Sequence, residues 1–334
     1  MTRILKLCSL TLLLMGLTVQ LSLATNNPVE IGSLMQKPDM KELIYKTVGE
    51  LKLRIYWLKP ESVKVGEKRA AIIWIHGGGW SYGGASAFFP HARYFAARGA
   101  IAFSIDYRLL KSDGSSTMAN CVADCKSAIR YIRLHAEELG VDPNKIIVMG
   151  DSAGGHLASC LGTITGFDDP MDNFKISATP NAMVLYNPLS DFTTSPFIKL
   201  IIGGAAMDKK PTPESLIPTP AQLELAKKLS PLFNVRSNQP ATLVLHGLDD
   251  KIILPEQSIL FSQAMKKAGN KCELVLLPNT SHAFVCTQYR ASEEEVVAAI
   301  READKFLIGL KLLSGEPSLV VSQQPAWIPI GRKK

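Results

Sequence analysis

The sequence has little cysteine and only one long apolar run. Six cysteines among 334 residues are too few for a fold that depends on a framework of disulfides. Beyond residue 24, no apolar run reaches the length of about 20 residues that a membrane-spanning helix needs. Lysine and arginine are scattered, and no long basic block is interleaved with aromatic residues. The sequence therefore argues against a disulfide scaffold, a second membrane span and a nucleic-acid partner.

What the sequence does contain is an ordinary globular composition. Hydrophobic residues make up 46% of the chain and charged residues 20%, which argues against a largely disordered protein. The formal net charge of +7 is spread along the chain, and we interpret most of it as solvated surface. The length allows one large domain or two ordinary ones.

The first 24 residues differ from the rest. Arg3 and Lys6 precede an apolar run at residues 7–23, and Ser22-Leu23-Ala24 offers small residues at the −3 and −1 positions of a cleavage site. This pattern predicts a secretory signal peptide over residues 1–24. The mature protein would then be secreted or periplasmic, without stable membrane association. An uncleaved membrane anchor is the alternative, which the polar residues within the run weaken.

Cleavage of the signal peptide would also change the charge and the cysteine count. It would remove two basic residues and one cysteine, which leaves a net charge of +5 and five cysteines. Because five is odd, at least one thiol stays free or pairs between chains. We interpret most of the five as buried small hydrophobic residues.

Short apolar runs alternate with segments of helical spacing along the chain. The strand-like runs are 51–57, 70–75, 100–105, 145–149, 182–186, 241–245 and 272–277. All but the first are continuous or nearly so, which is typical of strands buried on both faces of a parallel sheet. Helical spacing is found at 118–139, 256–268 and 292–312. This alternation predicts an α/β fold with helices on both faces of the sheet.

The segment 192–229 interrupts this rhythm with five prolines. It is too long for an ordinary connection, so we interpret it as an insertion that covers the carboxyl edge of the sheet, as lids over α/β active sites do. The tail from residue 314 is either a loose extension or a segment that lies back on the domain, and the sequence leaves both open.

The pentapeptide Gly150-Asp151-Ser152-Ala153-Gly154 matches the G-x-S-x-G pattern. A predicted strand precedes it and a helical segment follows it, which is the setting of a nucleophile elbow. Glycine is needed in this turn because larger side chains would clash with neighbouring backbone. We therefore predict that Ser152 is a nucleophile whose hydroxyl projects clear of the sheet.

Residues 76–80, His-Gly-Gly-Gly-Trp, follow another predicted strand. Three consecutive glycines free the backbone to aim N–H groups at a developing negative charge, although a plain flexible turn is the simpler alternative. A run of this kind after the third strand is the oxyanion element of lipases and esterases. We predict that Gly78, Gly79 and Ala153 supply the N–H donors, and that His76 hydrogen-bonds within its own loop.

A base and its orienting acid should follow the serine, in the triad order Ser, Asp, His. His282 lies on a loop after the last predicted strand, where this order expects the base. The acid should follow the preceding strand, and two neighbouring carboxylates lie there, Asp249 and Asp250. The acid would hold the imidazole's tautomer and stabilise the imidazolium. The residues alone leave the choice between the two carboxylates open.

Together these motifs resemble the α/β-hydrolase esterases related to hormone-sensitive lipase and to bacterial acetyl and feruloyl esterases. Over roughly residues 45–312, the motifs that carry the resemblance, in the family's order and intervals, are His76-Gly-Gly-Gly-Trp80, Asp106-Tyr-Arg-Leu109, Gly150-Asp-Ser-Ala-Gly-Gly-His156, His246-Gly-Leu-Asp-Asp250 and Ser281-His-Ala-Phe284. In this family the acid falls four residues after the loop's histidine, so the resemblance favours Asp250. Leu254, where relatives commonly have proline, is a departure. Trp80 and the Gly-Gly-His156 run are more similar to the polysaccharide-associated branch of the family than to its cytosolic, detoxifying branch.

The resemblance implies one α/β-hydrolase domain over residues 25–313, with a mostly parallel eight-stranded sheet. The lid insertion would span about 192–229, and the tail 314–334.

It also implies a secreted serine carboxylic-ester hydrolase that removes acetyl or similar short acyl groups from plant polysaccharide fragments. Ser152, Asp250 and His282 would be its catalytic residues. The substrate would be a small-molecule or oligosaccharide ester, and neither a metal nor an organic cofactor is expected. The alternatives are a feruloyl or general short-chain carboxylesterase, a peptidase on the same fold, and a non-catalytic binding module.

Overall fold

The computed structural model describes residues 27–35, 40–61, 63–64, 66–111, 113–194, 198, 218–289 and 291–323. The predicted signal peptide lies outside these residues, as does most of the predicted insertion. None of the helices in the described part of the chain has the length and apolar character that crossing a membrane requires. The five cysteines of this part are free thiols, and all but Cys286 are buried, which confirms their interpretation as mostly buried hydrophobic residues.

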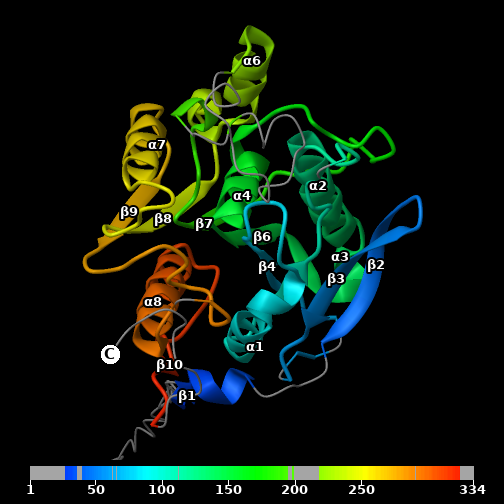
Figure 1. Cartoon of the computed structure of the whole chain (residues 1–334). Coiled ribbons are helices and arrows are strands. Elements are labelled where there is room, and N and C mark those ends of the chain that lie inside the picture. Colours follow the sequence, from blue (N-terminus) through cyan, green and yellow to red (C-terminus); the bar gives the residue numbers. More distant parts are fainter. Residues whose placement is uncertain are drawn as a thin grey trace, which may run out of the picture.

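An eight-stranded sheet forms the centre of the molecule (Figure 1). In spatial order its strands are β2 Lys41–Val48, β3 Leu51–Leu58, β5 Ile101–Ile105, β4 Arg69–Ile75, β6 Val141–Asp151, β7 Ala182–Tyr186, β8 Ala241–Gly247 and β9 Cys272–Leu277. Strand β3 is antiparallel to both β2 and β5, and every further pair from β5 to β9 is parallel. The predicted α/β fold with a mostly parallel eight-stranded sheet is confirmed.

Helices cover both faces of the sheet because its central strands present apolar side chains to both sides. Along β4, Ile73 and Ile75 belong to one core, whereas Ile72 and Trp74 belong to the other. The first core is covered by α2 Met118–Leu134, α3 Ala136–Leu139, α4 Ala153–Thr163, α6 Pro220–Leu229 and α7 Glu256–Lys267. The second is covered by α1 Phe89–Ala97 and α8 Glu293–Gly309.

The helix predicted over 118–139 is in fact two helices. Helix α2 ends at Leu134, and α3 begins at Ala136. Between them, both the backbone N–H and the Nδ1 atom of His135 bond to Tyr131 O, at 3.0 and 2.9 Å. This side-chain bond caps the first helix, so an uninterrupted helical spacing in the sequence hides a break.

The two ends of the predicted insertion 192–229 lie side by side. Phe192 N–H donates to Ser230 Oγ at 2.8 Å, and Leu232 N–H donates to Ser190 O at 3.0 Å. Its last part forms α6, which lies at the upper end of the view in Figure 1. Residues 195–197 and 199–217 lie outside the described residues, so the lid role stays a prediction.

The described part of the tail lies back on the domain, which the sequence left open. Strand β10 Leu319–Val320 pairs in parallel with β1 Val29–Glu30. Ser322 N–H donates to Glu293 Oε2 on α8 at 2.8 Å, and Ser322 Oγ accepts the Gly32 N–H at 2.8 Å. Strands β1 and β10 lie at the lower end of the view in Figure 1, away from α6.

Candidate active site

The predicted site residues converge at one edge of the sheet because each follows the carboxyl end of a parallel strand. Residues 76–80, which we call the oxyanion loop, follow β4, and Ser152 follows β6. Asp250 follows β8, and His282 follows β9. Ligand sites of open α/β sheets lie outside this edge, so the topology gathers residues that are far apart in the sequence.

Ser152 stands at a sharp turn between β6 and α4. Its φ of +55° lies in the left-handed region that residues other than glycine seldom adopt. The glycines on either side are needed because of close backbone contacts. A Cβ on Gly150 would lie 2.2 Å from Gly154 O, and one on Gly154 would lie 2.0 Å from Ile75 O. Backbone strain of this kind clusters at functional sites.

Ser152, His282 and Asp250 form a continuous hydrogen-bonded series. The Ser152 hydroxyl lies 2.9 Å from His282 Nε2, and His282 Nδ1 lies 2.6 Å from Asp250 Oδ2. When Nδ1 carries the proton, its N–H group donates a hydrogen bond to the carboxylate. Nε2 then carries no proton and can accept a hydrogen bond from the serine hydroxyl. The arrangement can therefore remove the hydroxyl proton as the serine attacks an electrophile.

The structure gives the two neighbouring carboxylates, Asp249 and Asp250, different surroundings. Asp249 is exposed, whereas Asp250 is 1% exposed and its Oδ1 accepts the N–H groups of Ile252 and Ile253, each at 2.9 Å. Burial acts to raise the pKa of Asp250, but hydrogen bonds from His246 and His282 outweigh it and hold this pKa well below its ordinary value. Asp250 thus faces His282 as a carboxylate.

Close packing also positions the loop that carries His282. A Cβ on Gly247 would lie 2.2 Å from Thr280 O, so the strand end at β8 lies directly against this loop. On its other side, the His91 Nε2–H group donates to Val285 O at 2.7 Å. Neither Gly247 nor His91 was predicted to act on the site, because only their place in the fold gives them this role.

The oxyanion loop follows a path that its glycines permit. Gly78 and Gly79 have φ of +106° and +59°, and a Cβ on Gly78 would lie 2.2 Å from Tyr82 O. Both glycines line the same cavity as Ser152. Ala153 is the first residue of α4, where backbone N–H groups have no acceptor within the helix. Gly78 and Gly79 thus line the cavity that Ser152 lines, and Ala153 directly follows Ser152.

Residues 57–265, more than half of the chain, match the BD-FAE family, and residues 227–307 match the dienelactone hydrolase family. The chain belongs to the BD-FAE family.

Its relatives are esterases. Esterase 2 of Thermogutta terrifontis has a solved structure that is 34% identical, with a TM-score of 0.72 over 84% of this chain and 98% of that chain. Esterase LipQ of Mycobacterium tuberculosis is 28% identical over 85% of this chain and 66% of its own length. An acetylxylan esterase of Xylanibacter ruminicola is 25% identical over 64% of this chain and 41% of its own length. The chain thus spans about two thirds or less of the length of these two curated relatives. The predicted resemblance to the α/β-hydrolase esterases is confirmed.

In this BD-FAE protein, His76, the first residue of the oxyanion loop, hydrogen-bonds within its own loop as predicted. Its Nδ1 lies 2.8 Å from Gly77 O, and its ring stacks on the Tyr107 ring with centroids 4.4 Å apart. The Tyr107 hydroxyl donates to His76 O at 2.9 Å. Burial lowers the pKa of His76 to about 4, so this imidazole is neutral near pH 7.

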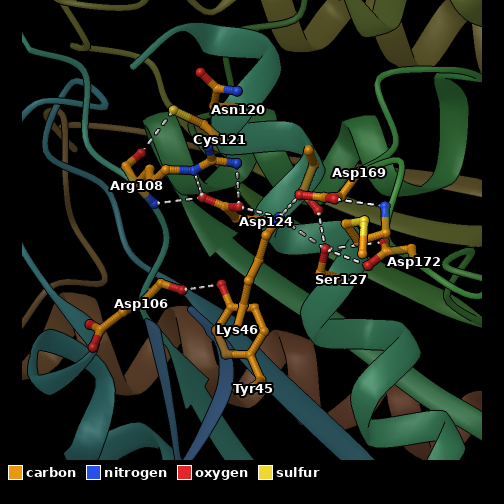
Figure 2. A network of polar contacts seen from close by, with 12 residues as sticks. Tyr45, Lys46, Asp106, Arg108, Asn120, Cys121, Asp124, Ser127, Asp169 and Asp172 are labelled. Atoms are coloured by element: carbon orange, nitrogen blue, oxygen red, sulfur yellow. Dashed lines mark hydrogen bonds and ion pairs between the residues drawn. The ribbon is translucent and has the colours of Figure 1, made fainter. Parts of the chain in front are cut away.

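Arg108, which follows Tyr107 in the chain, belongs to a network of charged side chains (Figure 2). Arg108 Nε and Nη2 donate to the two carboxylate oxygens of Asp124, both at 2.7 Å, and the Arg108 N–H donates to it as well. Lys46 Nζ lies 2.7 Å from Asp124 and 2.5 Å from Asp169. This network ties the segment after β5 to α2 and the β2–β3 hairpin. The sequence did not predict it, because a single aspartate in a helix carries no such signal.

A cavity of about 910 Å³ opens in front of Ser152. Its lining includes the oxyanion loop, the loop after Asp250 and the start of α7. Large apolar side chains that line the cavity and remain partly exposed to solvent are Tyr82, Ile252, Leu254, Leu260 and Tyr289. In the described part of the chain, no group of three or more His, Cys, Asp or Glu side chains is arranged to hold a metal ion.

Proposed function

We propose that the protein is a serine carboxylic-ester hydrolase that works through Ser152, His282 and Asp250. The observation that carries this proposal is the hydrogen-bonded series from Ser152 Oγ through His282 to Asp250, with Ser152 and His282 lining the cavity. His282 Nε2 takes the hydroxyl proton as Ser152 Oγ attacks the ester carbonyl. The same nitrogen then returns the proton to the leaving alcohol, which leaves an acyl-enzyme. His282 next activates a water molecule that releases the acid and restores the serine.

The negative charge that develops on the carbonyl oxygen is held by the N–H groups of Gly78, Gly79 and Ala153. Positive φ at both glycines and the helix start at Ala153 support this assignment. Loss of one such donor typically lowers kcat by about 10²–10³.

For the substrate, we propose acetyl or similar short acyl esters on plant polysaccharide fragments. The acetylxylan esterase relative and the similarity of Trp80 and the Gly-Gly-His156 run to polysaccharide-associated esterases support this choice. A feruloyl or general short-chain carboxylesterase is the second candidate. The partly exposed apolar side chains around the cavity, including Ile252, Leu254 and Leu260, favour it because they would suit an aromatic or aliphatic group.

A panel of esters tests these two candidates. The purified protein is assayed with acetylated xylo-oligosaccharides, methyl ferulate and a simple aryl acetate. We expect acetate release from the oligosaccharides with a kcat/KM above that for methyl ferulate. Turnover of the aryl acetate without acetate release from any glycan would refute the polysaccharide substrate and leave the esterase activity standing. No turnover of any ester would favour a non-catalytic binding module.

We also propose that the protein is exported. The basic residues Arg3 and Lys6, the apolar run at 7–23 and the small residues before position 25 support a cleaved signal peptide. The N-terminal sequence of the protein recovered from outside the cytoplasm tests this, and we expect it to begin at Thr25. Recovery from the membrane fraction with residues 1–24 intact would instead favour an anchor.

A further inference from the structure

We propose that His156 is a positioning residue that ties the oxyanion loop, through Trp80, to the nucleophile helix α4 and to the end of α6. This inference rests on the proposed function, since it concerns how the oxyanion loop of that reaction is held. Neither residue belongs to the Ser152, His282 and Asp250 series.

The hydrogen bond between Trp80 and His156 determines which ring nitrogen of His156 carries the proton. The Trp80 Nε1–H group donates to His156 Nδ1 at 3.2 Å. An indole N–H can only donate, so Nδ1 carries no proton and the neutral ring carries it on Nε2. That nitrogen lies 2.9 Å from Leu229 O and donates to it. Both ring nitrogens are thus used, by partners on two different segments.

Burial keeps the imidazole in this state. His156 is 0% exposed, and burial lowers its pKa to about 4. Protonation of Nδ1 would place two donors against each other at the Trp80 contact. The neutral ring is therefore a fixed bridge near pH 7 rather than a group that exchanges protons with the site.

Trp80 is the residue through which this bridge reaches the oxyanion loop. It directly follows Gly79, is 4% exposed and lines the cavity. Its φ of +58° lies in the left-handed region, which is strained for so large a side chain. Such a conformation persists only where the surroundings impose it. Here they do so at the indole and at the backbone, because Trp80 O accepts the Leu110 N–H at 2.8 Å.

His156 also contacts the predicted insertion at residues 192–229. Leu229 is the last residue of α6, and Phe192, at the opposite end of the insertion, packs edge-on against the His156 ring with centroids 4.8 Å apart. Phe192 also lies 5.5 Å from the Trp80 ring. One imidazole on the helix that begins after Ser152 therefore contacts the oxyanion loop and both ends of the insertion. A shift of α6 would be transmitted to Trp80 and so to the backbone of Gly78 and Gly79.

Trp80→Phe tests the contact on the oxyanion side. This variant keeps an aromatic ring and removes the indole N–H. We expect kcat for an aryl acetate to fall tenfold or more, towards the roughly 10²-fold that a displacement of about 1 Å can cause, while KM changes less than about threefold. The affinity for a trifluoromethyl ketone should fall in parallel, because its adduct with the serine carries the charge that the oxyanion loop would hold.

His156→Asn tests the contact on the insertion side. Asparagine retains an acceptor near the position of Nδ1 but has no donor that reaches Leu229 O. We expect kcat to fall in this variant as well, and the double variant to lose less than the product of the two single losses, because both act on one bridge. Trp57→Phe is the matched control, since Trp57 lies on β3 and does not line the cavity. It should leave kcat and the inhibitor affinity unchanged.

The outcomes separate this inference from the proposed function. If the wild-type protein hydrolyses aryl acetate but folded Trp80→Phe retains kcat and inhibitor affinity within twofold, the positioning role is wrong. Wild-type kcat in His156→Asn would contradict the coupling to α6, even if Trp80→Phe does not fold. A wild-type protein without turnover would instead refute the proposed function itself.

Discussion

Asp249 and Asp250 are adjacent in the chain, yet the fold gives them different surroundings. Asp250 is buried and lies 2.6 Å from His282 Nδ1, whereas the Asp249 side chain is exposed and its backbone N–H donates to Thr280 O at 3.0 Å. From the residues alone the two were equivalent candidates for the acid. The resemblance favoured Asp250, and the structure gives this preference a physical reason.

At the residue scale, we therefore expect Asp250→Asn to reduce kcat severely and Asp249→Asn to change it little. An amide at position 250 would favour the wrong imidazole tautomer, a change that costs about 10⁴ in kcat in the serine proteases. The measurement is kcat for an aryl acetate in both variants, with folding checked by circular dichroism. If Asp249→Asn were the more damaging change, the assignment of the acid would be wrong.

At the scale of elements, the sequence predicts best what is both apolar and continuous. The runs at 70–75, 182–186 and 272–277 are strands with nearly the predicted bounds. Strand β2 was not predicted as an apolar run. None of its residues is buried, and exposed and half-buried positions do not alternate regularly along it. Strand β10 has only two residues, too few to carry a period. Its pairing with β1 depends on contacts between the two ends of the described chain, which no local pattern encodes.

Residues that position the site through tertiary contacts are likewise not predicted by local sequence patterns. The G-x-S-x-G and H-G-G-G runs are local signals, so Ser152 and the oxyanion loop could be predicted. Asp124, Tyr107 and His91 act through neighbours that only the folded chain supplies.

The buried ion pairs between α2 and its neighbours give a prediction at this scale. The Asp124 side chain is 0% exposed, while those of Arg108 and Lys46 are 13% and 11% exposed. Asp124→Asn would leave both cations without their shared partner, so we expect the free energy of unfolding to fall by about 3–5 kcal/mol. Urea denaturation measures it. Glu302→Gln, which breaks the exposed pair with Lys305, is the control and should cost at most about 1 kcal/mol. A loss below about 1 kcal/mol in Asp124→Asn would show that Asp169 and solvent compensate.

At the scale of the whole molecule, buried neutral histidines make stability depend on pH. Burial lowers the pKa values of His76, His91 and His156 to about 4. In the unfolded chain the ordinary value is about 6.5, so between these limits the unfolded state binds more protons. The stability contributed by these neutral rings is therefore present above about pH 6.5 and is lost as the pH falls towards 4. Asp106 and Asp151, whose pKa values burial raises, offset part of this loss at the lower end.

We expect the free energy of unfolding to fall with a slope that approaches about 4 kcal/mol per pH unit near pH 5, which corresponds to three protons. Urea denaturation at several pH values between about 7.5 and 5 measures this slope. His91→Asn should reduce the slope by about one proton, whatever its effect on stability at neutral pH. A flat stability between these pH values would contradict the neutral, buried state of these side chains.

Hydrolysis of p-nitrophenyl acetate by the wild type and by Ser152→Ala tests the claim that Ser152 is the nucleophile of an ester hydrolase. We predict turnover by the wild type and a loss of at least about a thousandfold in kcat for the folded variant. The claim would be contradicted by wild-type rates in Ser152→Ala, or by a folded wild-type protein that does not turn over this ester.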